Sequence, residues 1–206
     1  MPGLALYDVS VGTFTKALNV LLNILNKAEA YAQEKGVDVD SYAATALCED
    51  MKPLSFQIQV ASNTVKKSLW RLTGDEGESW DDNETTIEQL KARVQKTLDL
   101  TKTVDADKIN GKEDNNVELY VSVSVPVPVP FLPPPFPHAH VTQTNRKGSR
   151  QMGKAGTMNL TAQGYVFNYA LPNLFFHVQT AYAILRMKGV PLGKQDYLQP
   201  FMKPDA

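Results

Sequence analysis

The sequence predicts an all-α protein that folds as a four-helix bundle. Four long segments space their apolar residues three and four positions apart, as one face of a helix requires: residues 7–35, 54–73, 85–101 and 171–186. A polar stretch long enough for a non-adjacent connection separates the second segment from the third, and a proline-rich segment at 117–160 separates the third from the fourth. Packing the four apolar faces together buries them most simply, with the proline-rich segment as an inserted β arm between helices three and four.

The fourth helix organises the rest of the chain, because it is apolar over most of its circumference. A helix of this kind is expected to be buried on more than one side. Pro172 suits its first turn, where a missing N–H costs nothing, and Gly189 followed by Pro191 marks its end. His177 stands in the middle, and a buried imidazole must find hydrogen-bond partners.

Length and composition favour one globular, cytoplasmic domain that covers residues 1–206. Hydrophobic residues make up 43% of the chain and charged residues 21%, which is typical of a folded domain. The formal net charge of -1 gives no indication of a nucleic-acid partner, and no apolar run is long enough to span a membrane. Cys48 is the only cysteine, so no internal disulfide can form, and we expect it to be a small buried residue.

Capping residues set the expected boundaries of the first two helices. Gly36 and Gly74 supply left-handed ends for them. Between these helices, residues 37–46 are expected to hold a short helical segment with Asp40 or Ser41 as its N-cap.

The third helix is expected to begin at residues 85–88, Thr-Thr-Ile-Glu, which has the composition of a capping box. Its apolar residues face inward, and Arg93 is expected to face solvent with the neighbouring charged residues. The tail at 190–206 is expected to be a proline-bearing coil that packs back on the bundle through Tyr197, Leu198 and Phe201.

The inserted arm begins as a strand, because residues 117–125 alternate in polarity and are rich in β-branched side chains. Seven prolines between 126 and 137 restrict the middle of the arm to an edge strand and then polyproline II, and residues 157–160 are a candidate returning strand. Bare valines and phenylalanines would favour aggregation, so we expect the arm to pack on its own bundle or on a second copy in a homodimer. Docking into an aromatic-lined groove of a partner is the alternative.

Several runs together resemble an uncharacterised domain-of-unknown-function family of the DinB-like superfamily. They are Leu171–Lys194, Asp50-Met51 and Gln57-Ile58-Gln59. The resemblance covers roughly residues 7–120 and 160–198 and implies an up-down-down-up four-helix bundle.

Better-known members of this superfamily bind a divalent metal through three histidines at one end of the bundle, and some are thiol-cofactor transferases or isomerases. The present chain has Gln57 and Gln59 where a histidine would be wanted, and Ala181 stands four positions after His177. We therefore expect neither a metal nor another cofactor by inheritance.

The candidate site is a pocket at the bundle end around His177, which is expected to face the interior beside Gln59 and Asn63. His177 would act as general acid/base or polar anchor there. A core histidine satisfied by one hydrogen bond is the alternative role. The expected catalytic residues are His177, Gln59 and Asp50, and the expected ligand-binding residues are Gln57, Phe56, Asn63, Phe175 and Tyr182.

Three functions remain open from the sequence. The first is handling of a small-molecule ligand, by a metal-independent isomerase, cyclase or transferase of secondary metabolism or by a binding relative of one. The second is a non-catalytic dimeric interaction protein that uses the arm. The third is a divalent-metal enzyme in which His138 and His140, on one side of a strand, join His177 as ligands. Two loop histidines are the simpler interpretation of His138 and His140.

Overall fold

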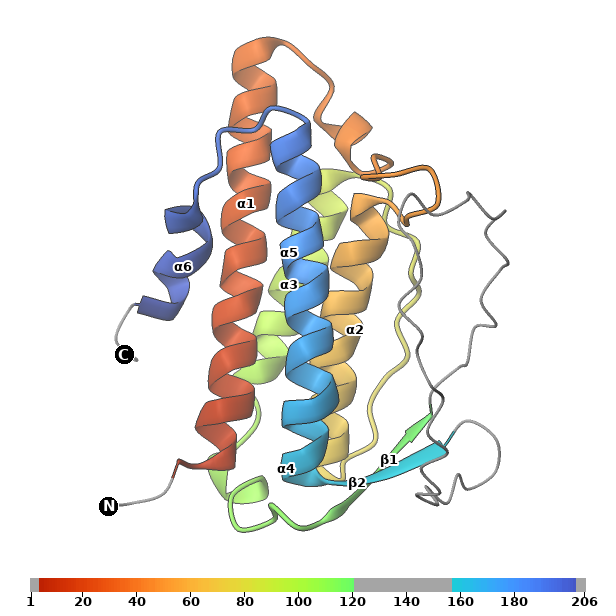
Figure 1. Ribbon diagram of the computed structural model, residues 1–206, viewed down its shortest axis with the longest axis vertical. Helices are drawn as coiled ribbons and strands as arrows, with labels where there is room; N and C mark the ends of the chain where they lie inside the picture. Colours follow the sequence, from red (N-terminus) through yellow and green to blue (C-terminus); the bar gives the residue numbers. More distant parts are fainter. Residues whose placement is uncertain (1–3, 121–156, 203–206) are drawn as a thin grey trace, which may run out of the picture.

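Four long helices lie side by side in the computed structural model, which describes residues 4–120 and 157–202 (Figure 1). They are α1 (Thr13–Lys35), α2 (Leu54–Thr73), α3 (Ile87–Thr101) and α5 (Leu171–Met187). Helix α1 packs on α3 and α5, and α2 packs on the same two helices, so α1 and α2 lie diagonally opposite. The fold is mostly helical with one small β hairpin, as the sequence predicts.

The helix directions explain the long polar crossover between α2 and α3. In Figure 1, α2 and α3 both run toward the end of the bundle that carries the strands, whereas α1 and α5 run away from it. Residues 74–86 must therefore travel the length of the bundle before α3 can begin. This crossover lies against α2 and α3, and it helps to form two clefts on that side of the bundle.

The connection between α1 and α2 contains a short 3-10 helix, η2 (Val39–Tyr42). Its N-cap is Asp38, whose side chain accepts a hydrogen bond from the backbone N–H of Asp40. The prediction that Asp40 or Ser41 is the N-cap is therefore wrong. Asp40 has a longer-range role, because its carboxylate accepts a hydrogen bond from the backbone N–H of Ile87, at 2.8 Å.

The capping box of α3 is shifted by one residue from its predicted place. Thr86 is the N-cap and accepts a hydrogen bond from the backbone N–H of Gln89, while the Gln89 side chain accepts one from the backbone N–H of Thr86. The box Thr85-Glu88 is thus replaced by Thr86-Gln89. Both pairs satisfy the sequence rule, and the structure uses the second.

The arm begins and ends as an antiparallel hairpin, β1 (Asn116–Tyr120) with β2 (Thr157–Thr161). The predicted returning strand at 157–160 is confirmed. Residues 121–125, the prolines, His138 and His140 lie outside the described residues. After β2, the helical segments α4 (Ala162–Tyr165) and η4 (Val166–Ala170) lead directly into α5.

The tail forms a helix, α6 (Lys194–Met202), so the predicted coil is wrong. The Asp196 carboxylate accepts a hydrogen bond from the backbone N–H of Gly193 at 2.7 Å, which stabilises the first turn of α6, and forms an ion pair with Lys27 of α1 at 2.9 Å. Tyr197 and Phe201 pack against the core, as predicted. Pro200 lies inside α6, so the proline does not prevent a helix that these contacts of Asp196 stabilise.

All four long helices contribute fully buried apolar side chains to one core. Hydrogen-bonding side chains also enter it, and each buried side-chain nitrogen or oxygen within the described part of the chain has a partner. A short 3-10 helix, η3 (Ala106–Lys108), follows α3. Of the helices described, none is long and apolar enough to cross a membrane.

Candidate functional site

His177 of α5 faces α2, and its hydrogen-bond partner is Gln57. The Nδ1 atom of His177 lies 2.7 Å from Oε1 of Gln57. The amide nitrogen of Gln57 donates in turn to the backbone carbonyl of Lys52, at 2.9 Å. Because an amide oxygen only accepts, Nδ1 must carry the proton, and Nε2 is left as the acceptor of the neutral ring.

Burial keeps this imidazole neutral. His177 is 8% exposed, and burial lowers its pKa from 6.5 to about 4. The ring of Phe176 stands edge-on to it at 5.2 Å between centroids, and that of Phe56 does so at 6.2 Å. Among the described residues, Nε2 has no hydrogen-bond partner, and no fully buried side-chain nitrogen or oxygen lacks one, so Nε2 is not fully buried.

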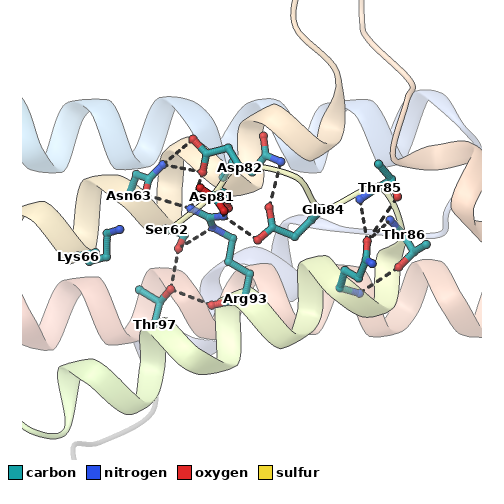
Figure 2. A network of polar contacts seen from close by, with 12 residues as sticks. Ser62, Asn63, Lys66, Asp81, Asp82, Glu84, Thr85, Thr86, Arg93 and Thr97 are labelled. Atoms are coloured by element: carbon teal, nitrogen blue, oxygen red, sulfur yellow. Dashed lines mark hydrogen bonds and ion pairs between the residues drawn. The ribbon is translucent and has the colours of Figure 1, made fainter. Parts of the chain in front are cut away.

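Gln59 and Asn63 do not lie beside His177. They face the crossover on another side of α2, where Gln59 donates to Glu84 at 3.1 Å. Asn63 donates to Asp82 at 3.0 Å (Figure 2). The sequence-based expectation that either one neighbours the imidazole is wrong. Gln57, two residues before Gln59, takes that place.

Arg93 is the centre of the network on this side of α2 (Figure 2). Its guanidinium contacts Glu84 at 2.7 Å and Asp82 at 2.6 Å, both on the crossover, while Nε donates to Ser62 of α2 at 3.2 Å. Arg93 is 4% exposed, so the prediction that it faces solvent is wrong. The signal that could have located it is the acidic run in the crossover, which a buried guanidinium can pair with.

The remaining predicted site residues lie in two further places. Phe175 packs near Phe201, and Tyr182 packs edge-on to Tyr197, so both face α6. Asp50 is exposed in the loop before α2. The structure therefore brings together His177, Gln57 and Phe56 from the predicted set, and places the others elsewhere.

The side chains around His177 do not fit a divalent metal. Among the described residues, its hydrogen-bond partner is a glutamine amide and two phenylalanine rings pack against it, whereas such metals need imidazole, carboxylate or thiolate ligands. Over the ranges 4–120 and 157–202, no three His, Cys, Asp or Glu side chains are grouped to hold a metal ion. Cys48 is exposed, so the prediction of a buried cysteine is wrong.

A large cleft lies along the crossover. It has a volume of about 540 Å³ and is walled by Trp70 of α2, Trp80 of the crossover and the end of α3. A second cleft, of about 470 Å³, lies beyond the segment that crosses Trp70 and extends to β1. Gly77 packs so closely on Trp70 that an added Cβ would overlap the indole ring. Neither cleft is lined by His177.

Behind Trp80 lies Lys66 of α2, which is only 2% exposed. Its ammonium is 4.4 Å from the centroid of Trp80 and 5.0 Å from that of Trp70, and it donates to the backbone carbonyl of Glu78 at 3.3 Å. Burial, and then the charge of Arg93, lower the pKa of Lys66 from 10.5 to about 8. Sequence reasoning missed this lysine; two tryptophans flanking a polar crossover were the available signal.

Comparisons with known proteins identify relatives along most of the chain. Residues 6–127 and 136–198 match a family described as a domain of unknown function, DUF1993. A crystal structure of a DinB family member protein from Shewanella denitrificans is similar, with a TM-score of 0.72 and 30% sequence identity. That match covers 98% of the present chain and 96% of the other. No curated protein matches.

Proposed function

Because the chain belongs to the DUF1993 family and shares the DinB fold, we propose that it handles a small molecule with His177 as a metal-independent polar group. The observation that carries this proposal is the bond from His177 to Gln57, because it fixes the tautomer and leaves Nε2 free to accept a hydrogen bond. The proposal assumes an up-down-down-up bundle, which agrees with the helix directions in Figure 1.

The setting favours a particular kind of ligand. Phe56 and Phe176 supply apolar contact beside the imidazole, and Phe176 is 58% exposed. A ligand with an aromatic body and one O–H or N–H group would use both the rings and Nε2. A ring with a pKa of about 4 stays neutral near pH 7, so it would orient the ligand as an acceptor and abstract only acidic protons.

The test is a fragment screen by NMR on protein with isotope-labelled histidine rings. Phenols and indoles are the probes, and the His177 ring signals report their binding. We expect phenols to shift these signals in the wild type and in Gln59→Leu, and to bind Gln57→Leu more weakly because the ring then loses its fixed tautomer. Because His177→Ala has no such ring signals, its binding is measured on the phenol signals by saturation transfer, with the wild type measured in the same way. Equal binding of the phenols by wild type and His177→Ala would overturn the proposal.

A second candidate is the dimeric interaction protein. The observation that favours it is the exposure of apolar side chains on the hairpin, where Tyr120 is 71% exposed and Met158 is 42% exposed. The experiment deletes residues 125–145 and measures mass in solution. If this deletion converts a dimer to a monomer, and His177→Ala leaves binding of the phenol probes intact, the interaction function replaces the ligand-handling one.

The metal enzyme with His138, His140 and His177 remains a proposal, because two of its ligands lie outside the described residues. Analysis of the metal content of untagged protein tests it.

A further inference from the structure

The amine of Lys66 lies one layer behind the wall of the large crossover cleft. Three groups contact it: the indole of Trp70, the indole of Trp80 and the carbonyl of Glu78. All three residues also line the cleft of about 540 Å³. A molecule in this cleft is separated from the amine by these indole side chains, so an indole must shift before the two can meet.

The surroundings of Lys66 are unusual for a lysine. Within the described part of the chain, no carboxylate forms an ion pair with its ammonium, although nearby Lys96 and Lys108 each have one. The charged groups that act most strongly on Lys66 are mainly cations, namely Arg93 and Lys96 of α3 and Lys67 of α2, against the anion Asp82 of the crossover. Low solvent access and like charges favour the neutral amine, against the two indole faces and the Glu78 carbonyl, which favour the ammonium.

We propose that Lys66 is a carbonyl-binding residue, whose amine condenses with a small aromatic aldehyde or ketone held in the crossover cleft between Trp70 and Trp80. The amine nitrogen attacks the carbonyl carbon and forms a C–N bond, while the carbonyl π pair moves to oxygen. A proton passes from nitrogen to that oxygen, and the carbinolamine loses water to leave an imine. No oxidant or reductant is consumed. This site is distinct from the one around His177.

The walls of the cleft explain why the ligand class is uncharged and aromatic. The indole rings offer flat apolar faces for stacking. The cleft is also lined by four carboxylates, those of Asp75, Glu76, Glu78 and Asp99, against two ammonium groups, those of Lys96 and Lys108. This excess of negative charge disfavours an aldehyde that carries a phosphate or carboxylate.

The lowered pKa supports the same chemistry. At about pH 7.5, an amine with a pKa of about 8 is neutral in roughly a quarter of molecules, whereas an ordinary lysine is neutral in about one in a thousand. Restricted access reduces this advantage, so we expect reaction at Lys66 to be about tenfold or more faster than at a surface lysine.

The experiment uses benzaldehyde as the probe and borohydride to trap the imine, followed by peptide mapping. Lys67 is the internal control, because it is the next residue on the same helix and is exposed. We expect label at Lys66 to saturate at one equivalent, at least tenfold faster than at Lys67, with a half-maximal rate near pH 8. Equal labelling of the two lysines, or labelling of Lys66 only when the pH reaches that of an ordinary lysine, would overturn the proposal.

Two variants make the result specific to the site. Lys67→Arg should keep the wild-type rate and extent of labelling at Lys66. Lys66→Met should lose the saturating label, and far-UV circular dichroism with a urea titration shows whether it is folded. If Lys66→Met does not fold, the comparison of labelling rates at Lys66 and Lys67 in the wild type still tests the proposal. His177→Ala should leave labelling unchanged, which separates this site from the proposed function.

Discussion

The amide oxygen of Gln57 lies 2.7 Å from Nδ1 of His177 and joins α2 to α5 inside the bundle. This bond satisfies a ring that is almost fully buried, and it selects one tautomer. The His177–Gln57 pair therefore has a structural role in stability and a proposed role in ligand binding, and each role can be measured separately.

Gln57→Leu should lower the free energy of unfolding by about 1–3 kcal/mol, because a buried imidazole N–H loses its acceptor while the side-chain volume is kept. Urea unfolding measures this change. Gln179→Leu, at an exposed position on α5, is the matched control and should change stability by no more than about 0.5 kcal/mol. Equal effects of the two substitutions would show that the bond contributes nothing.

The stability of the protein should fall in acid through His177. Its pKa is lowered from 6.5 to about 4 by burial, so the folded state prefers the neutral ring. The resulting stabilisation is fully present above the unfolded pKa of about 6.5 and is lost as pH falls toward about 4. His177→Gln cannot titrate, so the difference in unfolding free energy between wild type and this variant should change across that window. A difference that is constant with pH would contradict the lowered pKa.

Arg93→Met should destabilise the protein by about 2–4 kcal/mol, since it leaves the half-buried Glu84 carboxylate without its main partner and frees the crossover. Lys91→Met, on the same helix as Arg93, removes a more exposed ion pair with Glu29 of α1 and should cost less than about 1 kcal/mol. Chemical denaturation compares the two. Tryptophan fluorescence should also change in Arg93→Met, because Arg93 lies 5.8 Å from the centroid of Trp80.

Thr86→Ala should cost about 0.5–2 kcal/mol, because α3 loses its side-chain cap. Thr85→Ala should cost less, since Thr85 is exposed and its backbone N–H bonds the Gln89 side chain whatever its own side chain is. Thermal unfolding of both variants tests the one-residue shift of the capping box. The reverse order would restore the box that the sequence alone suggested.

Local sequence determined the helices of this protein. The apolar spacing and the glycine after Thr73 predict residues 54–73, and α2 has these bounds. The same logic predicts α5, whose first turn accepts Pro172. Such features depend on neighbours within one helical turn, so no knowledge of the rest of the fold is required.

Tertiary structure decided which polar side chains meet. Gln57 and Gln59 are about 200° apart around α2, so one of them can face α5 only if the other faces elsewhere. The periodicity fixes that angle, but the diagonal placement of α1 and α2 decides that Gln57 meets His177 and Gln59 meets the crossover. Arg93 and Lys66 are buried for the same reason: residues 74–86, folded back along the bundle, bring carboxylates and indoles to positions that the helices alone would leave in water.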